Sequence, residues 1–297
     1  MNKSRSPNTV FLLAGWKFTF RYIFVKCLFC YFSRLVMIIP PIDMNQVIVS
    51  DYMYQNPPKN RYIMYYRLIS PLECIGKSID SRDFQQNPRK YRSVELFESY
   101  KWVCWLSEKT NIRLSSAINI AKQYGWIIEL IKEKLGNNEN SIPLELFLVD
   151  NDPIKEIPMN DLAFFINNYN SIFEKTGVYI GDGDEPYAWE FIWEYVRQQV
   201  APEMTSRLFS CFLFDNLLDT ENFKKEKFNH SNIIVKIEIK EYRTICKFDM
   251  NWLSNVLVEA TFSEAHVYAS NYWQQKETED PIWEFLCDCI YIPVELN

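Results

Sequence analysis

The segment AWEFIWEYVRQQVAPEMTSRLFSCFLF, residues 188–214, decides the fold of this chain. From 188 to 200 the apolar side chains recur at helical spacing, which predicts a helix with one apolar face. Pro202 ends that helix, and the apolar run from 207 to 214 predicts a strand that is buried on both faces. Ser206 and Arg207 therefore lie where a helix leads into a core strand. Their side chains either point into a cleft or satisfy a loop amide and a nearby carboxylate.

Composition narrows the class of protein. The chain has 297 residues, of which 48% are hydrophobic and 16% aromatic, so it can bury a sizeable core. It contains only seven glycines, and neither GxGxxG nor GxxxxGK[ST] occurs. This argues against Rossmann and P-loop nucleotide binding.

The segment before residue 188 predicts one strand followed by helices. RYIMYYRLIS, residues 61–70, is typical of a strand that Pro71 ends, and Arg67 within it either pairs, faces a ligand or points outward from an edge. Helical spacing follows at 93–108, 112–135 and 162–173, with a short strand at 143–149. We expect the region of about 93–177 to be a helical insertion.

The segment after residue 214 predicts further strands. A charged helix is expected at 219–227, and residues 233–239 alternate like a half-buried strand that forms a hairpin with 243–248. Ser263 and Glu264 predict the start of a helix through Tyr272. From Pro281 a short turn or helix is expected to lead into a final strand. Helices in the middle and strands towards the ends favour a mixed α+β domain.

Residues 1–43 differ from the rest of the chain. They hold six basic residues and one acidic residue, so of the net charge of −6 they contribute +5 and the remaining chain carries −11. Residues 10–39 are apolar, but basic residues interrupt them before they reach the roughly 20 residues of a membrane span. We interpret this extension as a translated leader upstream of a start at Met44 or Met64, a poor signal anchor, or a membrane-surface helix. Residues 44–297 are expected to form a single domain.

Metal and triad chemistry find no support in the sequence. The eight cysteines show no zinc-ligand spacing, the chain has only two histidines, and GDGDEP at 181–186 lacks the spaced ligands of a calcium loop. No metal is therefore expected. Buried reduced thiols are typical of a cytoplasmic protein, with peripheral membrane binding through residues 10–39 as the alternative.

The order of six motifs resembles an uncharacterised bacterial family that looks related to the ADP-ribosyltransferase fold. These motifs are MYYRLIS, WEFIWEYVR, APEMTSRLFSCFLF, FDMNWL, ASNYWQQ and PIWEFL, and they span residues 64–294. In this resemblance Glu190 and Arg197 match a helix, Ser206 and Arg207 a turn, Tyr272 and Trp273 a pair, and Glu284 a glutamate before the last strand. Thr205 stands where the family usually has proline, which loosens the turn.

The resemblance implies an α+β fold with an ADP-ribosyltransferase-like core and an NAD-dependent transfer of ADP-ribose, or NAD cleavage. It implies that Glu284 stabilises the positive charge that develops on the ribose and that Ser206 holds the ribose or positions the strand. Arg67 or Arg207 would bind the NAD phosphates, and Tyr272 or Trp273 would stack on a ring. Proteins of this superfamily often act as toxins or in conflict between cells and phages.

Two hypotheses from different classes stay open. The chain is either an enzyme with NAD as co-substrate or a non-catalytic nucleotide-binding or protein-interaction module that keeps the fold. The enzyme hypothesis expects Arg67, Ser206 and Glu284 to converge on one cleft. The acceptor would be a protein, a nucleic acid, a small molecule or water, and the acidic body argues only against broad, charge-driven nucleic-acid binding.

Overall fold

The structure is a computed structural model that describes residues 63–70, 75–83, 93–147, 152–181, 188–227, 232–257 and 259–296. Contacts group Arg61–Asn297 into one compact unit that contains all of these residues. Helices and antiparallel strands make it a mixed α+β fold, which confirms the predicted class. The predicted N-terminal extension lies outside the described residues, as does most of the acidic turn at 181–186.

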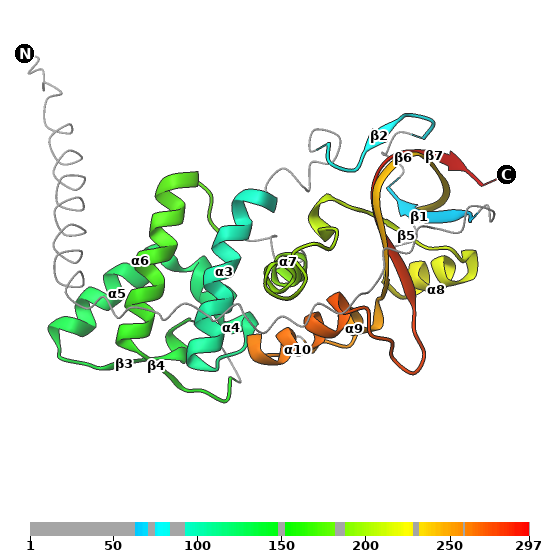
Figure 1. The fold of residues 1–297 in the computed structure, drawn as a ribbon. Helices are drawn as coiled ribbons and strands as arrows, with labels where there is room; N and C mark the ends of the chain where they lie inside the picture. The colour runs from blue at the N-terminus through cyan, green and yellow to red at the C-terminus, as the bar shows by residue number, and fades with distance from the viewer. Residues whose placement is uncertain are drawn as a thin grey trace, which may run out of the picture. The chain divides into compact units, whose positions relative to one another are not determined.

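One antiparallel sheet forms the end of the unit at which the C-terminus lies (Figure 1). The strand order is β1-β6-β7-β2, and the short strand β5 also pairs with β7. The long neighbours β6 and β7 curve together, because β6 carries two register shifts against β7 and such bulges bend a strand. The strands are β1 (Tyr65–Ile69), β2 (Ile79–Asp80), β5 (Cys211–Leu213), β6 (Ile233–Asp249) and β7 (Trp283–Glu295).

The predicted hairpin between 233–239 and 243–248 is wrong. These residues form the single strand β6, which pairs with β7 from Val235 to Asp249. The intervening residues Lys240, Glu241 and Tyr242 include none of the glycine or asparagine that tight hairpin turns require. The register shifts near residues 240 and 243 take up the irregularity of this stretch without a reversal of the chain.

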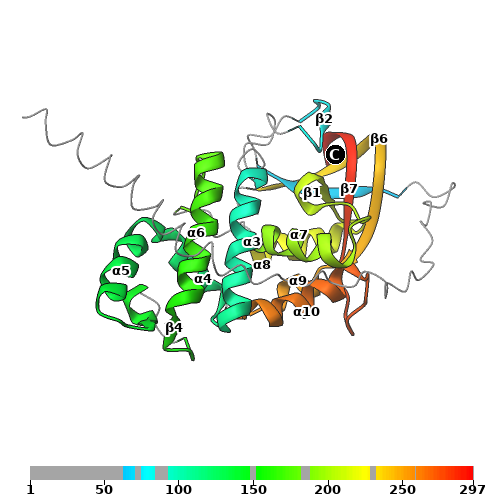
Figure 2. The same ribbon diagram turned by 60° about the vertical axis from the view of Figure 1, so that its left-hand side comes forward.

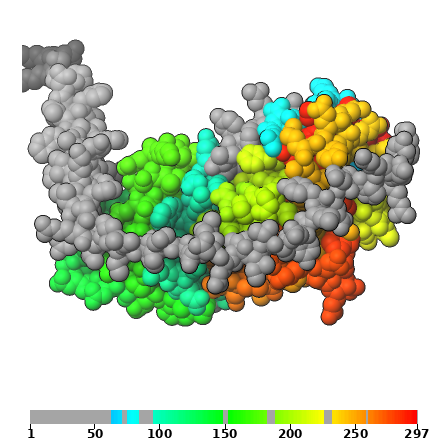
Figure 3. All heavy atoms as spheres, in the orientation of Figure 1, coloured from blue at the N-terminus to red at the C-terminus, as the bar shows by residue number. Residues whose placement is uncertain are grey.

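Apart from α8, which lies beside β1 on the far side of β7 in Figure 1, the described helices form two groups on one side of the sheet. Two of them, α7 and α10, lie between the sheet and the more distant group in both views (Figures 1 and 2). Figure 3 shows the distant group in green at the end opposite the strands. The helices are α3 (Ser93–Thr110), α4 (Leu114–Lys122), α5 (Tyr124–Gly136), α6 (Met159–Thr176), α7 (Ala188–Val200), α8 (Leu217–Lys227), α9 (Asn251–Ser254) and α10 (Phe262–Trp273).

The region 112–149 differs from its prediction in two places. The expected helix 112–135 is divided at Gln123, whose backbone leaves helical geometry and whose side chain donates a 2.7 Å hydrogen bond to the Phe147 carbonyl. The expected strand from 143 is replaced by the 3₁₀ helix Leu144–Phe147. The preceding residues, β3 (Ser141–Pro143), pair with β4 (Glu156–Pro158).

Alternation along β7 separates the two faces of the sheet. Cys287, Cys289 and Tyr291 point into one apolar core, together with residues of β1, β5 and β6. Glu284, Leu286 and Asp288 have the other parity and therefore belong to the opposite face. Near Glu284 this second face packs against α10, because the Tyr272 ring stacks on Phe248, the β6 partner of Glu284.

Candidate functional site

Ser206 and Arg207 lie in a capped turn between α7 and β5. The helix ends at Val200, two residues before Pro202, as predicted. Arg207–Phe209 then forms one turn of 3₁₀ helix, at whose start Ser206 Oγ accepts a hydrogen bond from the Leu208 amide at 3.2 Å. The strand begins only at Cys211, so its predicted start at 207 is wrong. The serine cap holds the arginine outside the ladder and turns it towards α7 and α10.

Arg207 is the centre of a buried polar cluster. Its Nε and Nη2 donate to the two carboxylate oxygens of Glu190, at 2.8 and 3.1 Å. Its Nη1 donates to Glu284 Oε1 at 2.5 Å and to Tyr272 Oη at 2.6 Å. The Arg207 side chain is 6% exposed and that of Glu284 3%. We call these four residues, Glu190, Arg207, Tyr272 and Glu284, the Arg207 cluster.

The electrostatics of the cluster favour the ion pairs that it contains. Burial alone would lower the pKa of Arg207, but Glu190 and Glu284 raise it well above its usual value. Burial likewise raises the pKa of Tyr272, so its hydroxyl keeps its proton and donates it to Glu284 Oε1 at 2.8 Å. The guanidinium also lies over the Phe212 ring, 4.6 Å from its centroid. Glu284 is thus held by a cation and a neutral donor, as a buried carboxylate requires.

A second network fixes the turn itself. Ser206 Oγ donates to Glu194 at 2.7 Å, and Glu194 accepts both Nε and Nη2 of Arg197 on the same helix. Arg197 Nη1 donates to the carbonyls of Pro202 and Met204, each at 2.7 Å. These bonds tie the turn after α7 back to the last turns of that helix. Thr205, in the place of the expected proline, hydrogen-bonds to Thr244 of β6.

Two other predicted site residues take different positions. Trp273 is fully buried, and its indole nitrogen donates to the Trp193 carbonyl at 2.9 Å, so it packs α10 on α7. Arg67 donates from Nη1 to Cys211 Sγ at 2.8 Å and to Tyr291 Oη at 3.1 Å. Tyr291 lies seven residues after Glu284 on β7, and an odd separation places two side chains on opposite faces of a strand. Arg67 therefore does not share a face of the sheet with Glu284.

Some buried charges were not found from the sequence. Glu194 was missed, although its spacing of three residues from Arg197 is a signal for a helical ion pair. Asp288 was missed as well: it is 3% exposed and accepts hydrogen bonds from Arg82, Arg243 and Ser81. A lone acid within the apolar run LCDCIYI was the available signal, because a buried carboxylate needs partners.

Comparison with known proteins gives a family of unknown function. The profile of the family described as "Protein of unknown function (DUF2441)" matches residues 149–290 of this chain. The matched part includes the Arg207 cluster and excludes Arg67. No curated protein matches the chain. Within the described ranges, no helix is both long and apolar enough to cross a membrane.

Proposed function

We propose that the protein is a non-catalytic binding module with an ADP-ribosyltransferase-like core, in which Glu284 stabilises the fold. The observation that carries this proposal is the state of the Glu284 carboxylate, which is 3% exposed and paired with Arg207. Transfer of ADP-ribose needs a carboxylate beside the ribose of NAD, where positive charge develops as the bond to nicotinamide breaks. A carboxylate that already neutralises a buried arginine is poorly placed for that task, since releasing it leaves Arg207 with one partner fewer.

The position of Arg67 supports the same proposal. An NAD site built as the resemblance implies needs Arg67 and Glu284 on one cleft, but the two residues belong to opposite faces of the sheet. Trp273 is also fully buried against Trp193, which leaves no ring face for a ligand. The expected site residues therefore serve packing and ion pairing in this fold.

ADP-ribosyl transfer is the second candidate, and one observation favours it. Arg207, Tyr272 and Glu284 come from three separate motifs and still meet within hydrogen-bonding distance. In this candidate Arg207 leaves Glu284 to bind the pyrophosphate of NAD, and the freed carboxylate faces the ribose. The bond between ribose and nicotinamide then breaks, nicotinamide leaves, and the acceptor or water forms the new bond to the ribose carbon.

One experiment separates the two candidates. The full chain is incubated with millimolar NAD, alone and with a cell extract as the source of acceptors, and released nicotinamide is measured. We expect no release above that of Glu284→Gln, with thermal unfolding showing that both proteins are folded. Glu190→Gln is the matched control, because it removes the other carboxylate that pairs with Arg207. If nicotinamide release persists in Glu190→Gln and disappears in Glu284→Gln, the proposal of a non-catalytic module is overturned and the ADP-ribosyl transfer candidate is supported instead.

A further inference from the structure

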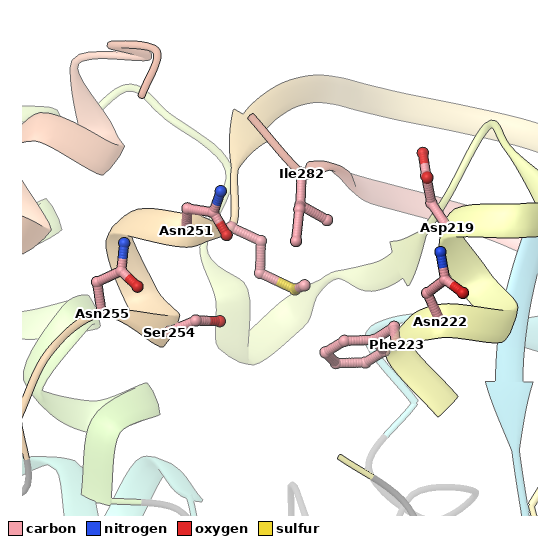
Figure 4. Close-up of a pocket in the computed structure, with 8 residues that line it drawn as sticks. Asp219, Asn222, Phe223, Asn251, Ser254, Asn255 and Ile282 are labelled. Atoms are coloured by element: carbon pink, nitrogen blue, oxygen red, sulfur yellow. The ribbon is translucent and has the colours of Figure 1, made fainter. Parts of the chain in front are cut away.

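A pocket of about 350 Å³ lies between α8, α9 and the residues that lead into β7 (Figure 4). Its lining comes from the FDMNWL motif, which contributes Met250 and Asn251, from Ser254 and Asn255 at the end of α9, from α8, and from Ile282. None of its lining residues belongs to the Arg207 cluster. Its volume is in the range of small-molecule sites.

The wall of the pocket is preorganised by Asp249, which is fully buried. One Asp249 oxygen accepts the amides of Asn251 and Ile282 at 3.0 and 3.1 Å. The other accepts the amide and the hydroxyl of Thr278 at 2.7 and 2.6 Å. The Asn251 side chain in turn donates to the Asp280 carbonyl at 2.5 Å. Asp249 therefore holds the strand end, α9 and the loop before β7 in fixed positions, as a binding site requires.

The charge of the described residues that line the pocket is negative. Figure 4 shows Asn251, Ser254 and Asn255 on one side and Asp219 and Asn222 on the other. Asp219 is the only ionisable group, and among the described residues that line the pocket there is no lysine or arginine. Asp219 also makes no ion pair with any described residue. The carboxamide and hydroxyl groups of the lining can both donate and accept hydrogen bonds, so the preference comes from the charge of Asp219, which favours a donor with positive charge and disfavours phosphate.

The apolar part of the lining sets the rest of the ligand. Phe223 and Ile282 lie between the two polar groups in Figure 4, and Met250 completes the apolar surface. An alkyl stem can pack on this surface while its charged head reaches the rim. We propose that this pocket binds an organic cation, an ammonium or guanidinium group on an aliphatic stem. Such a group is carried by a free amine or by a lysine or arginine side chain of a peptide. The proposal does not depend on whether the protein turns over NAD.

The test measures binding of agmatine to the full chain by calorimetry, with pentanamide as an uncharged probe of similar length. We expect agmatine to bind and pentanamide not to bind. Asp219→Asn should lower the affinity for agmatine about ten- to hundred-fold, which is the loss expected when one hydrogen bond to a charged group is removed. N-acetyl-arginine methylamide, used as a second probe, distinguishes a peptide side chain from a free amine, because its backbone must also fit.

Glu221→Gln is the matched control, since it removes the same charge from the same helix. Glu221 is exposed and lies about 200° around α8 from Asp219, on the side away from the pocket. It should leave the affinity for agmatine unchanged. The proposal is overturned if agmatine does not bind to the folded wild-type chain or if pentanamide binds equally well. It is also overturned if Asp219→Asn and Glu221→Gln lower the affinity for agmatine to the same extent.

Discussion

At the scale of single residues, the Arg207 cluster makes a clear prediction for stability. Among the described residues, Arg207 is the only cation paired with Glu190 and Glu284, so Arg207→Met leaves the buried Glu284 carboxylate with the Tyr272 hydroxyl but no cation. Breaking a buried pair from one side typically costs about 3–5 kcal/mol. We expect a loss of this size in the free energy of unfolding, measured by urea denaturation.

The control for this prediction is an exposed pair in the same chain. Lys240 and Glu238 are 3.1 Å apart with half-exposed side chains, so Lys240→Met should cost less than about 1 kcal/mol. Adding Glu284→Gln to Arg207→Met should recover part of the loss, because it removes the stranded charge. If Arg207→Met is as mild as Lys240→Met, the cluster contributes little to stability.

Tyr65 makes a prediction for alkaline pH. Burial, with smaller contributions from Cys287, Asp215 and Tyr242, raises the pKa of Tyr65 from 10.0 to about 12. Between pH 10 and pH 12 the folded chain therefore keeps a proton that the unfolded chain has lost. The stabilisation from this proton is complete below pH 10 and disappears as the pH rises towards 12.

The measurement compares wild type with Tyr65→Phe by urea denaturation from pH 8 to pH 12. The difference in unfolding free energy should be constant below pH 10. Above pH 10, the unfolding free energy of wild type should fall more steeply with pH than that of the variant. The difference in slope should correspond to at most one proton. Parallel curves across the whole range would contradict the assigned pKa.

At the scale of elements, helices were easier to predict from sequence than strands. Periodic apolar side chains and clear stop signals identified α6 and α7, which end before Gly177 and Pro202. The strand β6 was divided into two because its bulges interrupt the alternation on which strand prediction depends. The predicted cap at Ser263 was also wrong. The N-cap is Thr261, two residues before Ser263, and Glu264 forms a capping box with Thr261.

The same limit applies to the candidate site. The resemblance in motif order led us to expect Arg67, Ser206 and Glu284 to converge, whereas Glu284 contacts Arg207 and Tyr272. No local pattern links residues so far apart in sequence. Asp288 and its partners Arg82 and Arg243 were missed for the same reason, because their contacts depend on how three strands or turns meet. Burial of a charge is visible in a sequence only as an acid in an apolar run, and its partner is not.

Substitutions of two glycines, one at the end of α6 and one within α5, test how backbone conformation affects the stability of the chain. Gly177 ends α6 with a φ of +70°, which side chains with a Cβ adopt at a cost, so Gly177→Ala should destabilise the chain by about 1 kcal/mol. Gly125 lies within α5 with open space around it, so Gly125→Ala should stabilise by up to about 1 kcal/mol. Thermal unfolding of the two variants should shift in opposite directions, and shifts of the same sign would show that backbone conformation does not decide the effect.

At the scale of the whole molecule, the residues that the family profile matches differ from the bounds of the compact unit Arg61–Asn297. Residues 149–290 contain α7, α10 and most of the sheet but lack β1, which pairs with the edge of β6. They also lack α3, whose Tyr100 ring stacks on Phe191 at 4.7 Å and whose Ser107 hydroxyl accepts the Phe262 amide at 2.9 Å. The match therefore ends inside the packed core on both sides.

We expect a fragment of residues 149–290 not to fold cooperatively. Without α3 the apolar faces of α7 and α10 lose their cover, and without β1 the β6 edge is open to pairing with other chains. The fragment should show a broad urea transition by circular dichroism and should aggregate. A chain of residues 61–297 is the control, and it should unfold in one sharp transition. A sharp transition of the fragment at the midpoint of the control would mean that α3 and β1 are accessories to an autonomous domain, and the packing across α3, α7 and α10 would then contribute little to its stability.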